Sequence, residues 1–231
     1  MLAAERIKSR RRQLRQRGAE PTLRNGLGFR RLACLWGRAM SRGHIAPLRA
    51  ALAERPVFWG LAVVLVGSWL IAASSWVAIP MYPVPMTMQT FAILFISGLA
   101  GARLALACVI TWLAQAAFGL PLLADGGGGL EAFSGPTAGY LAGFAIAATV
   151  CGWLTERPAL RGWLAMTGVF IAGHALILAF GWTRLAMLIG AGPAWEGGIA
   201  PFFVGSALKS VLAVAVVKLA EPQVRRAVKA A

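Results

Sequence analysis

Residues 120–144 of the chain read LPLLADGGGGLEAFSGPTAGYLAGF and separate two long apolar runs. The stretch holds a run of four glycines, Gly126 to Gly129, between two acidic residues, Asp125 and Glu131. Glycine allows backbone conformations and close approaches that other residues do not. Two interpretations therefore stay open from these residues alone: a flexible turn between membrane helices, or a loop whose backbone amides reach a ligand.

The rest of the chain is too apolar for an ordinary soluble domain. Of its 231 residues, 58% are hydrophobic and only 13% are charged. No charged residue occurs between Val57 and Ala102. Several uncharged runs exceed the roughly 18 residues that indicate a spanning helix. We therefore predict an all-α, polytopic membrane protein with a single membrane domain.

Prolines and glycines divide the apolar part into six predicted transmembrane helices. Three prolines between residues 80 and 85 cannot continue a helix and end the first span, and Pro222 is expected to end the last one. The spans are predicted at about 57–79, 87–101, 104–119, 137–155, 162–182 and 202–220. The predicted organisation is a basic N-terminal extension (1–55), a six-helix membrane domain (56–222) and a short basic tail (223–231).

The distribution of basic residues predicts the orientation in the membrane. Most of the 23 Lys and Arg precede residue 56, whereas the connections on the opposite side contain only Arg184. By the positive-inside rule both termini are then cytoplasmic, an N-in and C-in arrangement. The Pro-rich connection, the Gly-rich connection and residues 183–201 fall together on the outer face. This grouping predicts a shallow extracytoplasmic binding site.

The basic N-terminal extension allows several interpretations. Its arginines suit an anionic lipid surface, so membrane lipids are expected contacts, and part of it fits an amphipathic helix. Met40 is an alternative start codon. A net charge of +15 also suits a tail that binds nucleic acid, which predicts that deleting residues 1–39 abolishes function. The positive-inside pattern explains the charge better, so no nucleic-acid partner is expected.

Lys209 is the sharpest signal in the membrane domain. It lies near the middle of the last apolar segment. A charged residue deep in a span is costly and usually faces the protein interior or a polar cavity. Lys218, near the inner end of the same segment, fits the alternative of a long side chain that reaches the membrane interface. For Lys209 we predict a functional role as counter-charge to an anionic substrate.

Other polar residues near the predicted outer helix ends have two interpretations each. Thr87 and Gln89 are either helix caps, with Thr87 the natural one, or ligand contacts. Tyr140 is either an interfacial tyrosine or a ring that packs on a ligand. His174 lies mid-span, where a hydrogen bond to a neighbouring helix is favoured over a place in the cavity.

The chain lacks the residue patterns of common enzyme classes, and we predict that it is not an enzyme. The glycine run is not followed by Gly-Lys-Ser/Thr, so the chain is not expected to hydrolyse ATP. Ser134 and His174 are the one pair that fits an intramembrane protease, but Ser134 lies in a loop without the first glycine of that motif. No metal site is expected. Cys34, Cys108 and Cys151 are interpreted as free thiols.

Several motifs together resemble one family. In chain order they are VPMTMQT (84–90), GLP (119–121), the glycine run, GPTAGYLAGF (135–144) and PFFVGSALK (201–209). With these motifs, residues 57–220 resemble the BioY family, the biotin-binding S components of energy-coupling-factor (ECF) transporters. The long basic N-terminus is not part of the family pattern.

The resemblance implies a fold, a function and partners. It implies six helices and a biotin site open to the outside, capped by the connections between helices 1 and 2 and between helices 3 and 4. It implies a multi-pass protein of the bacterial inner (plasma) membrane that takes up biotin. A transmembrane coupling protein and a pair of ATPases are the implied partners, so ATP is used only by them and no cofactor is expected in this chain. The alternatives are an S component for another vitamin and, from a different class, an intramembrane enzyme.

The residues and the resemblance together predict a biotin site. Lys209 is expected to neutralise the carboxylate, and the apolar parts of biotin are expected to pack on aromatic rings such as Trp76. Many relatives carry an acidic residue at the position of Ser206, so a ligand contact or the counter-ion of Lys209 is expected to differ here. The predicted substrate-binding residues are Gln89, Gly127, Gly128, Gly129, Tyr140, Phe203 and Lys209.

Overall fold

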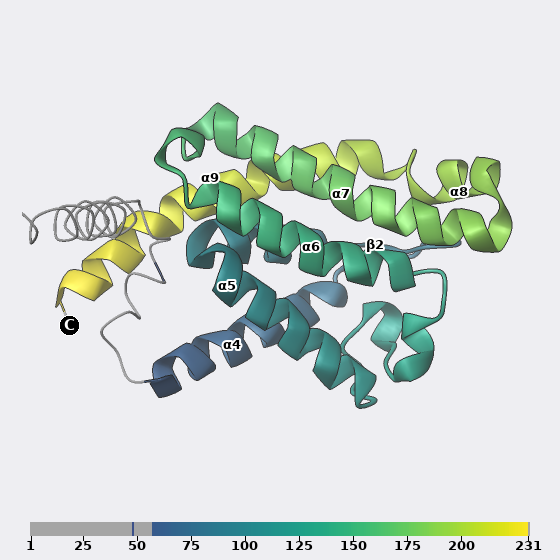
Figure 1. Cartoon of the computed structure of the whole chain (residues 1–231), viewed down its shortest axis with the longest axis horizontal. Helices are drawn as coiled ribbons and strands as arrows, with labels where there is room; N and C mark the ends of the chain where they lie inside the picture. Colours follow the sequence, from purple (N-terminus) through teal and green to yellow (C-terminus); the bar gives the residue numbers. More distant parts are fainter. Residues whose placement is uncertain (1–47, 49–56, 231) are drawn as a thin grey trace, which may run out of the picture. The chain divides into compact units, whose positions relative to one another are not determined.

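The computed structural model describes residue 48 and residues 57–230. The chain divides into two units, residues 1–43 and residues 44–231. The first unit lies outside the described residues, as do almost all of the predicted N-terminal extension, Met40 and Cys34. The described part of the second unit is predominantly helical (Figure 1).

Five helices in the described residues are long and apolar enough to cross a membrane. Their large apolar side chains are exposed on α4 especially, where Phe58 and Trp69 point away from the other helices, as lipid contact requires. An all-α membrane fold is confirmed. The five helices are α4 (Val57–Ser75), α5 (Gln89–Ala117), α6 (Ala138–Thr155), α7 (Trp163–Ile189) and α9 (Phe202–Ala230).

Helix α5 reverses direction at Gly101. This residue has φ 78° and ψ 178°, a backbone conformation open almost only to glycine. Both ends of α5 lie at the end of α4: the Met88 amide donates to Val77 O, and Ser75 Oγ in the last turn of α4 donates to Leu122 O just beyond α5. The second and third predicted spans are therefore the two halves of α5. Six separate spans and the N-in, C-in orientation stay predictions.

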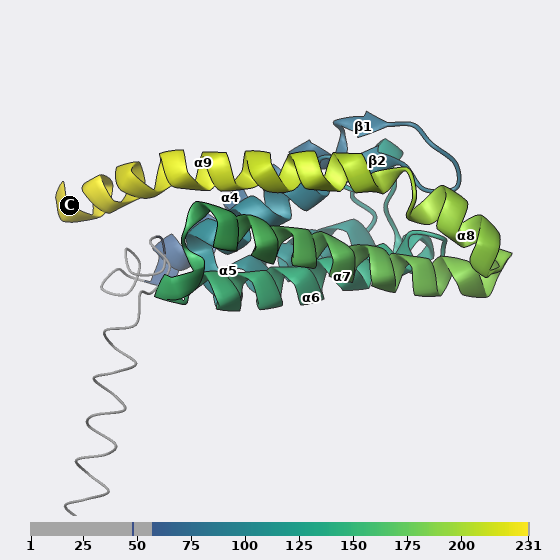
Figure 2. The ribbon, with the colours of Figure 1, turned by 90° about the horizontal axis from the view of Figure 1, so that it is seen from above.

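Helix α6 packs between α5 and α7, while α9 packs on α5 and α7. Figure 2 shows α9 running alongside the α6–α7 pair. Helices α6 and α7 approach closely because glycines face each other's helix: a Cβ on Gly143 would lie 2.9 Å from Ile177 Cα, and one on Gly181 would lie 2.2 Å from the Tyr140 ring. The core includes the fully buried Trp112 of α5. This packing fixes the helix ends that frame the site.

Short elements join the helices. Strands β1 (Ala78–Ile79) and β2 (Met86–Thr87) form an antiparallel hairpin around the Pro-rich connection, with Ala78 opposite Thr87. The second Gly/Pro-rich connection contains a helix that the sequence did not predict, α8 (Ala191–Gly198). The remaining elements are the 3₁₀ helices η1 (Ala124–Gly126), η2 (Leu130–Phe133) and η3 (Pro158–Leu160).

The prediction that Pro222 ends the last helix is wrong. Helix α9 contains Pro222 and continues to Ala230, so the predicted basic tail is helical up to that residue. A proline inside a helix removes one backbone hydrogen bond, and here side-chain contacts hold the helix next to it. Glu221 forms a 2.8 Å ion pair with Arg161, and Lys218 Nζ donates to Arg161 O.

Candidate functional site

Three connections meet at one end of the bundle, the end predicted to be outside. The β1–β2 hairpin touches α8, where a Cβ on Gly197 would lie 2.6 Å from the Pro83 ring. The Gly-rich connection is tied to α4 and α5, because Ser75 Oγ and Trp112 Nε1 both donate to Leu122 O, at 3.0 and 2.9 Å. These contacts place the β1–β2 hairpin and the Gly-rich connection over the same end of α5, α6 and α9.

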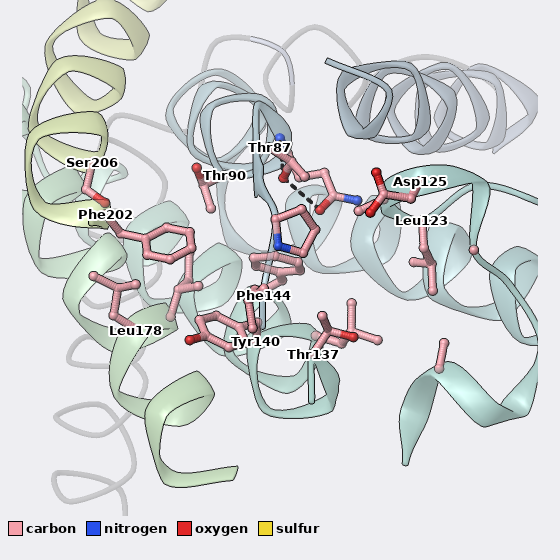
Figure 3. Close-up of a pocket in the computed structure, with 18 of the residues that line it drawn as sticks. Thr87, Thr90, Leu123, Asp125, Thr137, Tyr140, Phe144, Leu178, Phe202 and Ser206 are labelled. Carbon is pink, nitrogen blue, oxygen red and sulfur yellow. Dashed lines mark hydrogen bonds between the residues drawn. The ribbon is translucent and has the colours of Figure 1, made fainter. Parts of the chain in front are cut away.

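Between them lies a cavity of about 200 Å³ (Figure 3). Its wall is mostly apolar and aromatic, with a few polar groups that enter it from the hairpin, the Gly-rich connection and α9, a composition common to small-molecule sites. The lining residues are Val84, Pro85, Thr87, Gln89, Thr90, Leu123, Ala124, Asp125, Gly127, Ala132, Thr137, Tyr140, Leu141, Phe144, Ile177, Leu178, Phe202, Ser206 and Lys209.

Lys209 enters this cavity from α9. Its Nζ donates to the backbone oxygen of Thr87 in β2, at 2.8 Å. Its stem passes Gly205, where an added Cβ would lie 3.9 Å from Lys209 Cε. The half-buried ammonium group is therefore held at the cavity. It carries three N–H donors, and one of them is used on Thr87. Lys218 behaves differently, because its Nζ donates to Arg161 O outside the cavity.

Two residues that line the cavity at the start of α5, Gln89 and Thr90, each have a side-chain atom without a hydrogen-bond partner. The Thr87 hydroxyl donates to Gln89 Oε1 at 3.0 Å, the bond drawn in Figure 3. Gln89 Nε2 and Thr90 Oγ1 are buried and have no hydrogen-bond partner. Buried polar groups without a partner are costly, so these two atoms indicate a place for a polar ligand group. The residue before the helix is Met88, and Thr87 only accepts a 3.4 Å contact from the Gln89 amide, so it is at most a weak cap.

Tyr140 contributes its ring to the cavity wall. Its hydroxyl donates to Gly198 O of α8 at 2.8 Å, and its ring packs against Phe202 with centroids 6.4 Å apart. The ring fits because the facing residue of α7 is Gly181. The hydroxyl is therefore already used within the protein, and an apolar contact is what this residue offers a ligand.

The glycine run mainly shapes its own loop. The Gly127 amide donates to Ala124 O at 3.0 Å and the Gly129 amide donates to Ala116 O at 2.7 Å. A Cβ on Gly128 would lie 2.4 Å from Leu120 O, and Gly129 has φ 82°. Gly127 lines the cavity, but Gly128 and Gly129 are not among the lining residues. Of the three amides predicted to bind a ligand, that of Gly127 is thus bonded within the loop and that of Gly129 to the last turn of α5.

Comparison with known proteins identifies the family. The model of the BioY family matches residues 48–228, most of the chain. The chain belongs to the BioY family. It is similar to the "Biotin transporter BioY" of Rhizobium etli, with 36% identity over 57% of this chain and 74% of that protein. It is also similar to the "Biotin transporter BioY" of Thermotoga maritima, with 38% identity over 48% of this chain and 65% of that protein, just under two thirds of its length.

A solved structure shares the fold of this chain. The crystal structure of the S-component for biotin from an ECF-type ABC transporter superposes with a TM-score of 0.65. The match covers 71% of this chain and 92% of that chain, at 24% sequence identity. At this identity the match shows the fold. Together with its apolar helices, family membership makes the chain a multi-pass membrane protein.

In this BioY protein the predicted site residues divide into two groups. Gln89, Gly127, Tyr140 and Lys209 line the cavity. Phe203 does not: it is 53% exposed and packs edge-on against Trp195 of α8, at 6.0 Å between ring centroids. Its neighbour Phe202, one position earlier in α9, faces the cavity instead. Trp76, also expected to contact the ligand, is 69% exposed and is not among the lining residues.

The residues proposed for an intramembrane enzyme have other partners. Ser134 Oγ donates to Glu131 O within the Gly-rich connection, at 2.9 Å. His174 contacts Phe170 and Ser210 in the helix bundle. The described residues also contain no group of three or more His, Cys, Asp or Glu that could hold a metal ion. Nothing in this arrangement favours a nucleophile and base pair, and the BioY family consists of transporter components.

Sequence reasoning missed several cavity residues of this BioY protein. Thr90 was passed over although it follows Gln89 directly. Asp125 was noted only as part of the Gly-rich stretch, yet its carboxylate lines the cavity from a backbone with φ 56°. Phe144 lies one helical turn beyond Tyr140, and that spacing of four residues was the signal that both share one face of α6.

Proposed function

We propose that this protein binds biotin in the cavity and carries it across the membrane into the cytoplasm. The observation that carries the proposal is the set of unused donors in an otherwise apolar pocket. Gln89 Nε2 and Thr90 Oγ1 lack partners, and Lys209 Nζ has donors to spare. The named relatives of this chain are biotin transporters, and the S-component with the same fold is one for biotin.

The cavity suits the two ends of biotin and its apolar middle. Biotin has two oxygen acceptors, the carboxylate and the ureido carbonyl, and an amide, a hydroxyl and an ammonium group together supply donors for either. Its fused rings and aliphatic chain match apolar walls from Tyr140, Phe144 and Phe202. Of the two acceptors, the carboxylate gains most from Lys209 because both groups are charged.

Transport by this protein would take its energy from partner subunits. The glycine run is not a phosphate-binding loop, since no Gly-Lys-Ser/Thr follows it. The proposal therefore includes a transmembrane coupling protein and ATPases, as in the ECF-type transporter of the S-component that shares the fold. Co-purification of tagged protein with such subunits, followed by reconstitution with and without ATP, tests this part separately from ligand binding.

Equilibrium binding of labelled biotin to the full-length protein in detergent tests the central proposal. Saturable binding that unlabelled biotin displaces, and that thiamine and riboflavin do not, supports a biotin carrier. A monodisperse, cooperatively melting protein that shows no saturable biotin binding would contradict it. Displacement of a different labelled vitamin under the same conditions would then assign the S component to that vitamin.

A further inference from the structure

Helices α7 and α9 are joined by a polar contact next to the cavity. His174, only 3% exposed, lies one turn along α7 from the cavity residues Ile177 and Leu178. Its Nδ1 is 2.9 Å from Ser210 Oγ on α9 and 3.2 Å from Phe170 O in its own helix. Neither residue lines the cavity, so the proposed ligand site does not use this contact directly.

The hydrogen-bond network assigns the proton on the histidine ring. Ser210 has one hydroxyl proton, and its Oγ lies 2.8 Å from Ser206 O, the usual i−4 acceptor in a helix. If that proton goes to Ser206 O, then His174 Nδ1 must carry a hydrogen and donate it to Ser210 Oγ and Phe170 O. In the opposite tautomer Nδ1 would carry no proton and would face the Phe170 carbonyl oxygen, so two acceptors would lie 3.2 Å apart. The buried Nε2–H would also have no acceptor. The Nδ1–H tautomer therefore satisfies more atoms.

The bond ends on a segment of α9 that carries two cavity residues. Ser206 and Lys209 both line the cavity; Ser210 lies one helical turn beyond Ser206 and directly follows Lys209. The surrounding α7–α9 contact is apolar, formed by side chains such as Phe170 and Val214. Apolar packing alone is non-directional, whereas a hydrogen bond fixes the rotation of one helix against the other.

We propose that His174 is a positioning residue of the ligand site. Its Nδ1–H bond to Ser210 holds α9 in the rotation that presents Ser206 and Lys209 to the cavity. The expected effect of this bond on ligand affinity rests on the proposed biotin site. It is distinct from a ligand contact, because the ring reaches α9 and not the cavity.

Three substitutions at one position separate this role from general packing. The side-chain amide nitrogen of asparagine can occupy the place of Nδ1, while that of glutamine reaches the place of Nε2. We expect His174→Leu and His174→Gln to raise the Kd for labelled biotin about tenfold, as loss of one buried hydrogen bond would. The Kd of His174→Asn should stay within about twofold of that of the original protein, a change as small as that of a typical surface substitution.

A double-mutant cycle tests whether the effect passes through Lys209. Lys209→Met alone and with His174→Leu should give nearly the same Kd, because without the lysine only Ser206 is left for His174 to position. Additive losses would overturn the proposal, as would a His174→Asn protein as weak as His174→Leu or a His174→Leu protein with unchanged affinity. If the leucine variant does not fold, the asparagine and glutamine variants alone decide.

A readout without ligand keeps this inference separate from the proposed function. In a variant with the native cysteines replaced by alanine, Ser206→Cys places a thiol on the cavity wall. Its rate of reaction with a water-soluble methanethiosulfonate reports the rotation of α9. We expect the rate to change with His174→Gln and to be unchanged with His174→Asn. If the protein binds no biotin but this pattern holds, the proposed ligand is wrong and the positioning role stands. Equal reaction rates in the Ser206→Cys protein with histidine, glutamine or asparagine at position 174 would overturn the role.

Discussion

Replacing Lys209 with methionine is predicted to weaken biotin binding by about 10- to 150-fold. The ammonium group has three donors, and Thr87 O takes one of them at 2.8 Å. No other partner of Lys209 is found among the described residues, so the remaining donors can bond a ligand oxygen. A hydrogen bond to a charged group contributes about 1.5–3 kcal/mol. At about 1.4 kcal/mol per factor of ten in Kd, this gives the predicted range.

The assay is equilibrium binding of labelled biotin to purified protein, with a matched control on the same helix. Lys218 also lies on α9, and its Nζ donates to Arg161 O, away from the cavity. Lys218→Met removes the same charge from the same helix and should leave the Kd within about twofold. A comparable loss in both variants would mean that net charge or helix stability, rather than a ligand contact, sets the affinity.

Biotin methyl ester identifies the group that Lys209 contacts. If Lys209 pairs with the carboxylate, the ester binds the original protein about as weakly as biotin binds Lys209→Met, and the substitution costs the ester little. If biotin and the ester lose affinity equally, the lysine contacts the ureido oxygen. A folded Lys209→Met protein that binds biotin within about twofold of the original would refute the reasoning altogether, because the buried donor would then have no part in binding.

Three further predictions follow from the contacts described above. Gln89→Glu keeps the shape but replaces the unused amide donor with a buried carboxylate oxygen, so the Kd for biotin should rise at least tenfold in equilibrium binding. Gly181→Ala should destabilise the protein by about 1–3 kcal/mol in thermal unfolding, because the added Cβ would lie 2.2 Å from the tyrosine ring of α6; Gly168→Ala on the same helix meets nothing within 4 Å and should be neutral or stabilising. Arg161→Met should lower stability by about 1.5–3 kcal/mol because it removes the 2.8 Å charged hydrogen bond from Arg161 to Glu221; a variant that melts at the original temperature would contradict this.

The sequence predicted which residue types form the site better than it predicted which face of a helix each residue occupies. Lys209 was noted because a charged residue within a span is rare, and Gln89 because it is a polar residue at the start of a helix. Both line the cavity. Phe203 was predicted to bind the ligand and Phe202 was not, although the two are adjacent. One face of α9 meets lipid and the other meets protein, so hydrophobicity does not distinguish the two positions. Only the packing of α9 against α7 and α8 decides between two adjacent phenylalanines.

The helices of the fold were predictable from the sequence, but their reversals and ends were not. Apolar runs gave the helices, but the reversal within α5 depends on the φ of Gly101, which composition does not reveal. Pro222 indicated a helix end, but α9 continues through it, and contacts from Arg161, distant in sequence, hold the helix just before the proline. The hydroxyl of Tyr140 is likewise used by Gly198, 58 residues later. Which polar atoms remain for a ligand is decided by such tertiary bonds.

The two charges that line the cavity narrow the class of ligand. Lys209 donates from α9, while Asp125 lies on the Gly-rich connection and makes no hydrogen bond or ion pair among the described residues. A simple carboxylic acid can satisfy the lysine but has no N–H donor for the carboxylate of Asp125, which is an exposed residue. A ligand with both oxygen acceptors and N–H donors can satisfy each charge in turn. The ureido group of biotin supplies such donors, so the presence of Asp125 favours biotin over a fatty acid of similar length for this cavity.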